Sequence, residues 1–149
     1  TVDIDLCDNI TEAGKTAFYT NDADSFIATI DVSNVTWWKD SGHHPVAYYF
    51  GGTGNAKYEA MTLISGETTK YTVSTSVKRS EYSKIIFVDS TITGSGSGWP
   101  GGDIWKQTVD IDIPSCETCL YTLSSTETGG KQTGSWGTKI HGFGIYAFE

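Results

Sequence analysis

The sequence is poor in basic residues and has no long apolar run, and each shortage excludes a class of protein. Ten Lys and Arg residues stand against 18 Asp and Glu among 149 residues, so the formal net charge is -8 at pH 7. Nucleic acids and anionic membrane surfaces bind clusters of Lys and Arg, so we expect neither as a partner. No apolar stretch approaches the roughly 20 residues that cross a bilayer, which argues against membrane insertion. A neutral ligand fits this charge better.

The first residues also lack the charged region followed by an apolar stretch that is typical of a secretory leader. We therefore expect this to be the sequence of a mature, soluble protein. Its length suffices for a complete hydrophobic core, and no repeat or linker divides it. We expect a single domain over residues 1–149.

Cysteine is scarce too, since Cys7, Cys116 and Cys119 allow one disulfide and leave one thiol over. A bridge from Cys7 to Cys116 or Cys119 would staple the N-terminus, and the third thiol would then be a buried free cysteine or an intermolecular bridge. The Cys-x-x-Cys spacing also occurs in redox motifs and in half of a zinc site, but no second pair and no βαβ pattern accompanies it. We expect a structural disulfide.

Two Asn-x-Thr patterns, which begin at Asn9 and Asn34, are candidate glycosylation sites. Together with the cysteines they favour a secreted glycoprotein at an extracellular or cell-surface location.

Short segments of strand-favouring residues recur along the chain, with Gly-rich turns between them. No segment has apolar residues at helical spacing over more than about two turns, so helices should be short or absent. This regularity predicts an all-β fold, and specifically a β-sandwich. The expected strands are residues 1–6, 26–32, 46–50, 57–63, 69–77, 84–89, 108–113, 120–123 and 140–148.

Strict alternation of apolar and acidic residues marks positions 109–113. A strand here would bury Val109, Ile111 and Ile113 and turn Asp110 and Asp112 to the other face. Carboxylates on one strand face can bind Ca²⁺, but a solvated face is the simpler interpretation, and we predict no metal and no cofactor.

The five Trp residues offer flat faces on which a sugar ring can stack. Trp37 and Trp38 are adjacent, so on a strand they would point to opposite faces and one of them would face outward. Trp99 lies in a loop of Gly and Pro with few side chains to cover it, which predicts an exposed indole. Trp105 is expected to pack inward, whereas its neighbour Gln107 suits a sugar hydroxyl.

Around Trp38 the spacing of motifs is distinctive: Gly42 follows four residues later, and an Ala-Tyr-Tyr-Phe strand begins nine residues later. Further matches follow in order at residues 58–61, 84–87, 105–108, 110–114 and 120–122. In these motifs the chain resembles the starch-binding, family 26 type of carbohydrate-binding module. The likeness covers about residues 26–125.

This resemblance implies an immunoglobulin-like, antiparallel β-sandwich that binds α-glucan on an exposed aromatic platform and catalyses nothing. Trp38 and Tyr48 would stack on the sugar, Lys106 and Gln107 would bind its hydroxyls, and Trp99 would add a loop contact. Trp37 would replace Trp38 if the strand register turns it outward. The expected carbohydrate-binding residues are Trp38, Tyr48, Lys106, Gln107, Trp99 and Trp37.

Enzyme signatures are missing, since the sequence has neither a Gly-x-Ser-x-Gly elbow nor a His-Glu-x-x-His motif. His43 and His44 stand beside Pro45, which favours a surface or turn role for both imidazoles. We therefore expect a binding protein and not an enzyme.

The alternative function is self-assembly into an extracellular filament or surface layer. Residues 2–6 and 140–148 both alternate as strands do, and a terminal strand can complete the sheet of a neighbouring copy. Cys7 could then bridge to a cysteine of another copy, and a contact that does not close on itself would build a fibre.

Overall fold

The structure is a computed structural model of the chain, and it describes residues 24–35, 38, 41–128 and 130–139. These residues form twelve strands and no helix, which confirms the predicted all-β class. The expected terminal strands, together with Cys7, Asn9 and Trp37, lie outside the described residues. The strands are β1 (Ser25–Asp31), β2 (His44–Phe50), β3 (Lys57–Ala60), β4 (Thr62–Leu63), β5 (Lys70–Thr72), β6 (Val77–Lys78), β7 (Lys84–Ser90), β8 (Ser95–Ser97), β9 (Ile104–Thr108), β10 (Ile111–Asp112), β11 (Thr118–Thr128) and β12 (Lys131–Lys139).

All twelve strands belong to one mixed sheet. Ten of them follow the order β4-β5-β1-β11-β12-β9-β7-β2-β3-β8, while β10 pairs with β7 and β6 with β1. The antiparallel pairing that the sequence predicts is wrong at two places, because β1 runs parallel to β11 and β12 runs parallel to β9. Alternation along a strand specifies which side chains face the core, but it does not specify the direction of the neighbouring strand.

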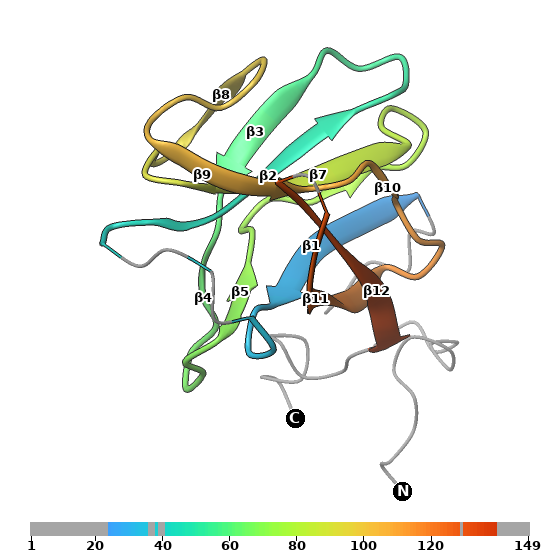
Figure 1. The fold of residues 1–149 in the computed structure, drawn as a ribbon. Helices are drawn as coiled ribbons and strands as arrows, with labels where there is room; N and C mark the ends of the chain where they lie inside the picture. The colour runs from blue at the N-terminus through green and yellow to red at the C-terminus, as the bar shows by residue number, and fades with distance from the viewer. Residues whose placement is uncertain (1–23, 36–37, 39–40, 129, 140–149) are drawn as a thin grey trace, which may run out of the picture.

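The sheet curls back on itself. Met61 alone separates β3 from β4, although these two strands lie near opposite ends of the strand order. In Figure 1, β2, β3, β7, β8 and β9 lie in the upper half of the molecule, and β1, β4, β5, β11 and β12 lie in the lower half. The chain therefore passes directly from one half to the other at Met61.

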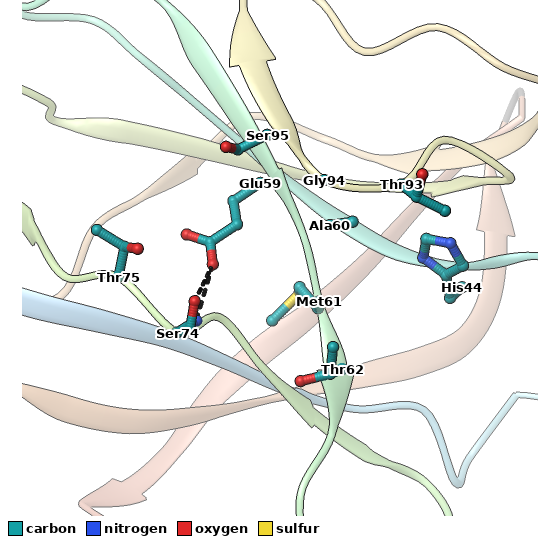
Figure 2. Close-up of a pocket in the computed structure, with 10 residues that line it drawn as sticks. All are labelled: His44, Glu59, Ala60, Met61, Thr62, Ser74, Thr75, Thr93, Gly94 and Ser95. Atoms are coloured by element: carbon teal, nitrogen blue, oxygen red, sulfur yellow. Dashed lines mark hydrogen bonds between the residues drawn. The ribbon is translucent and has the colours of Figure 1, made fainter.

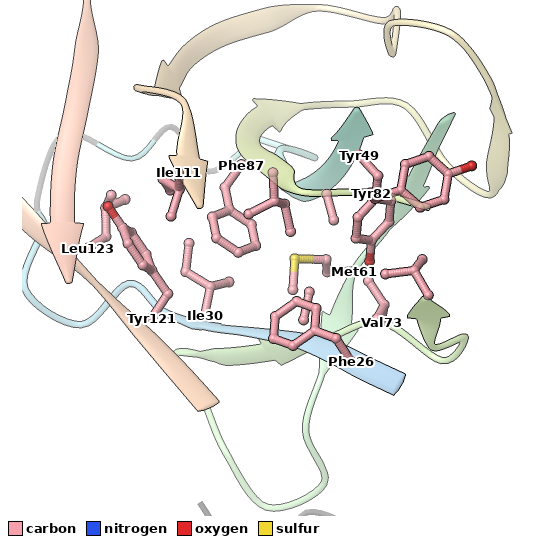
Figure 3. Close-up of a cluster of buried hydrophobic side chains, with 14 of the residues drawn as sticks. Phe26, Ile30, Tyr49, Met61, Val73, Tyr82, Phe87, Ile111, Tyr121 and Leu123 are labelled. Carbon is pink, nitrogen blue, oxygen red and sulfur yellow. The ribbon is translucent and has the colours of Figure 1, made fainter. Parts of the chain in front are cut away.

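The main hydrophobic core lies between these two halves (Figure 3). Alternate residues of β1 point into it, and Phe26 and Ile30 are fully buried. Phe87 of the upper half meets two aromatic rings of the lower half, with its centroid 5.4 Å from Tyr121 and 6.0 Å from Trp136. Each fully buried side chain of this size contributes about 1.5–3 kcal/mol, so these contacts hold the halves together.

A second, smaller cluster lies on the outer face of the upper half. Along β2, Ala47 and Tyr49 turn to the main core, whereas Val46 and Tyr48 turn to this outer cluster. Val46 is fully buried even though it faces outward. The outer cluster comprises Val46, Ile86 and Val88, with Tyr48, Phe50, Tyr58, Ala60 and Ile92 packed against them.

Residues 109–113 form a shorter strand than predicted, but their apolar and acidic side chains lie on the predicted faces. Only Ile111 and Asp112 form β10, while the longer strand β9 ends at Thr108. Ile111 is buried, and both Asp110 and Asp112 are exposed. Pro114 has no amide hydrogen to donate to a ladder, which restricts the continuation of β10.

Cys116 and Cys119 form a disulfide across the entry to β11, with their Cα atoms 6.2 Å apart. The expected structural disulfide is therefore confirmed, and its partners, which the sequence left open among three cysteines, are Cys116 and Cys119. The side chain of Arg79 donates to the Cys116 carbonyl oxygen at 3.2 Å and to the Ser25 carbonyl oxygen at 2.8 Å. These bonds fasten the disulfide loop to the start of β1.

Candidate functional site

An aromatic patch occupies the outer face of the upper half, and we define it as Tyr48, Phe50, Tyr58 and Trp99. Tyr48 of β2 lies directly opposite Tyr58 of β3. The rings of Tyr48 and Phe50 stack with centroids 5.4 Å apart. Trp99 meets Tyr48 edge-on, with centroids 4.7 Å apart and an interplanar angle of 71°. Because 43% of Trp99 is exposed, this indole is open to solvent as the sequence predicts.

Trp99 belongs to the segment 98–103, and hydrogen bonds fix both ends of this segment. The amide of Gly98 donates to the Ala56 carbonyl oxygen at 2.8 Å, beside β3. At the other end, the Ser90 hydroxyl donates to the Gly101 carbonyl oxygen at 2.6 Å, and the Asp103 amide donates to the Thr91 hydroxyl at 2.8 Å. Trp99 is therefore held at a defined place on the outer face.

Glycine at position 102 is required by both conformation and space. Gly102 has a φ of 80°, which L-residues with side chains rarely adopt. A Cβ atom there would lie 2.8 Å from the Ile92 nitrogen. The Gly-rich composition thus allows segment 98–103 to pack tightly against the turn that follows β7.

His43 anchors the same segment from the other side. Its Nδ1 lies 2.8 Å from Asp89 Oδ1, and its Nε2 lies 3.0 Å from Asp103 Oδ2. The His43 and Asp89 side chains are almost completely buried, whereas that of Asp103 is 66% exposed. We call this group the His43 clamp. The predicted surface role of His43 is wrong, because two carboxylates compensate for the burial of its polar ring.

The two carboxylates also set the proton affinity of the clamp. Burial by itself lowers the pKa of His43, but the hydrogen bonds and charges of Asp103 and Asp89 outweigh it and raise this pKa above its usual value. Protonated His43 donates to both carboxylates, so it links β7 to the segment that precedes β9.

The structure does not bring all the predicted sugar-binding residues together. Trp38 is partly buried against the main core, whereas Tyr48 belongs to the outer cluster, so the two do not share a face. Gln107 pairs with Val88 of β7, which places it on the same face as Tyr48. At ordinary strand spacing, roughly 12 Å separate the Cα atoms of Gln107 and Tyr48.

An irregularity in β9 explains why Trp105 does not pack inward as predicted. Between the pairs Val88–Gln107 and Ser90–Ile104, β9 contains one more residue than β7. Such a bulge bends a strand and redirects its side chains. Trp105 is accordingly 48% exposed, and the Nζ of Lys106 lies 5.4 Å from the centre of its ring.

Sequence reasoning missed Phe50 and Tyr58 as members of the patch. Alternation along β2 placed Phe50 on the same face as Tyr48, so this signal was present in the sequence. The position of Tyr58 depends on the pairing of β2 with β3, which alternation leaves open. The candidate glycosylation site Asn34 is exposed after β1.

No helix in the described part of the chain has the length and apolar character to cross a membrane. Within the same residues, no group of three or more His, Cys, Asp or Glu side chains is arranged to hold a metal ion. Comparison of the chain with protein-family models, curated proteins and solved structures found no match in any of the three.

Proposed function

We propose that this protein binds a neutral glycan, with α-glucan as the first candidate, by stacking sugar rings on the aromatic patch without catalysing a reaction. The observation that carries this proposal is the pairing of exposed Trp99 with Tyr48 at a fixed position. The apolar C–H face of a pyranose can stack on an indole. An aromatic ring held in place loses little conformational entropy when a ligand binds.

The shape of the patch suits a curved glycan chain better than a flat one. Trp99 and Tyr48 meet at 71°, so their faces form a corner and not a single plane. Phe50, whose ring is stacked on that of Tyr48, would offer the glycan a further aromatic contact. The phenol oxygens of Tyr48 and Tyr58 can donate and accept hydrogen bonds from sugar hydroxyls.

We also infer that the two halves of the curled sheet correspond to the layers of an immunoglobulin-like β-sandwich. The core that lies between the halves supports this inference. The disulfide between Cys116 and Cys119 supports the proposed extracellular location, because disulfides persist mainly in oxidising compartments.

The test is an amylose titration by calorimetry with three tryptophan and leucine variants. Trp99→Ala should weaken binding about tenfold or more, as truncation of a central aromatic contact does, without changing the thermal unfolding midpoint appreciably. Leu63→Ala is the matched control, since Leu63 is a 48% exposed apolar side chain on β4. Trp38→Ala should instead lower the unfolding midpoint, because Trp38 packs against the main core.

Two results would refute the proposal. One is equal amylose affinity for the wild type, Trp99→Ala and Leu63→Ala. The other is a wild type that forms filaments or large assemblies by light scattering and does not respond to amylose. The second result would favour the alternative, self-assembly through the terminal segments.

A further inference from the structure

A hollow of about 460 Å³ lies beside β3, close to the point where the chain passes into β4. Its walls come from the ends of β2 and β3, the turn after β5, and the residues that lead into β8 (Figure 2). Five of the residues that line it carry a hydroxyl group, namely Thr62, Ser74, Thr75, Thr93 and Ser95, while Ala60 and Met61 add apolar surface. Hydroxyls both donate and accept hydrogen bonds, so the hollow suits a ligand that is itself rich in hydroxyls.

Glu59 is the acidic group of the hollow, and the chain holds it in one orientation. The amide and the hydroxyl of Ser74 both donate to Glu59 Oε2, at 2.8 Å and 2.7 Å. Figure 2 shows the carboxylate reaching from β3 down to Ser74, with its other oxygen directed toward the side where Thr75 lies. This orientation leaves Oε1 available to a ligand without a change of rotamer.

The charge of the hollow is not balanced by its own walls. Among the described residues that line the hollow, Glu59 is the only Asp or Glu, and none is Lys or Arg. Within the described residues, no ion pair involves Glu59. The remaining titratable group is His44, at the opposite side of the hollow (Figure 2). A cationic group on a ligand would therefore find a carboxylate that is already positioned.

We propose that this hollow binds a small polyhydroxylated amine, of which an amino sugar such as glucosamine is the simplest probe. The ammonium group donates to Glu59 Oε1, and the ring hydroxyls bind the Thr and Ser side chains and His44. Charge-assisted hydrogen bonds of this kind are stronger than neutral ones. This site is separate from the aromatic patch and does not depend on the proposed glycan stacking.

The test uses three probes of similar size: glucosamine, N-acetylglucosamine and glucose. Titration by two-dimensional NMR near neutral pH should show saturable shifts at the amides of Ser74, Thr75 and Ser95. Glucosamine should bind about tenfold or more tightly than the two neutral sugars, because only its ammonium group is charged. Raising the salt concentration should reduce this preference.

Variants distinguish the carboxylate from general effects on the fold. Glu59→Gln should abolish the preference for glucosamine. Glu67→Gln should retain it, because Glu67 lies 3.9 Å from Lys70 away from the hollow. If Glu59→Gln does not fold, Ser74→Ala provides the second test, since it removes one of the two bonds that orient the carboxylate. In Ser74→Ala the preference for glucosamine over the two neutral sugars should fall severalfold.

Retained binding of glucosamine by Trp99→Ala would separate this site from the aromatic patch. Equal affinity for the three sugars, an unchanged preference in Glu59→Gln, or no saturable shift at the hollow would each overturn the proposal.

Discussion

Replacing His43 with leucine should destabilise the protein strongly, because it breaks the His43 clamp inside the fold. Leucine is similar in size, so the loss of two hydrogen bonds will dominate over any cavity. The bond to buried Asp89 is the larger contribution, since removing one partner of a buried ion pair costs about 3–5 kcal/mol. The bond to the exposed side chain of Asp103 adds about 1 kcal/mol or less. The unfolding midpoint should therefore fall by about 6–20 °C.

The pH dependence of this effect has a definite sign. The groups that face His43 are Asp89 from β7 and Asp103 from the segment before β9, and together they raise the pKa of His43 in the folded state. A raised folded-state pKa means that protonation favours folding. The stability difference between the wild type and His43→Leu should thus be full below the unfolded-state pKa, about 6.5. It should decrease as the pH rises through the folded-state pKa.

Urea unfolding followed by circular dichroism, at a series of pH values, measures this difference directly. His44→Leu is the neighbouring control and should change the free energy of unfolding by about 1 kcal/mol or less, because among the described residues the His44 ring has only a long hydrogen bond of 3.4 Å, with the Pro45 carbonyl oxygen. Asp103→Asn should give a small loss as well. A loss for His43→Leu no larger than that for His44→Leu, or one that grows with rising pH, would refute this account of the clamp.

Two further predictions concern the disulfide and a buried amide. Reducing the Cys116–Cys119 bridge, which closes a loop of only four residues, should lower the free energy of unfolding by about 2 kcal/mol; a double Cys→Ala variant that is as stable as the oxidised wild type would contradict this. Gln132→Leu should leave stability unchanged or raise it by about 1–2 kcal/mol, because the Gln132 amide is fully buried and has no hydrogen-bond partner among the described residues. A thermal midpoint that falls by more than a few degrees would show that the amide is satisfied in solution.

Strands rich in β-branched and aromatic residues could be predicted from the sequence, and strands poor in them could not. The predictions at residues 26–32, 46–50 and 84–89 correspond to β1, β2 and β7, each of which has β-branched or aromatic residues at its buried positions. β8 was missed because Ser95–Ser97, which pairs with β3, contains only Ser and Gly and none of the residues that favour a strand. β12 was missed for the same reason, since its sequence offers few apolar residues.

The candidate site could be predicted only where it depends on neighbours in sequence. The exposure of Trp99 follows from its Gly-rich surroundings and is confirmed. The separation of Trp38 from Tyr48 could not be foreseen, because it depends on which face of a curled sheet each side chain covers. The burial of His43 required knowledge of Asp89 and Asp103, which lie 46 and 60 positions away along the chain.

The parallel pairing of β1 with β11 has a consequence for synthesis in the cell. The Thr29 hydroxyl donates a hydrogen bond to the Cys119 carbonyl oxygen across this pair, and the two residues lie 90 positions apart. At about 5–20 residues per second, roughly 5–20 s pass between the emergence of β1 from the ribosome and that of β11. During this interval one edge of β1 has no partner strand, and an open edge can pair with another chain. The nascent protein is therefore most vulnerable to aggregation in the interval before β11 is made.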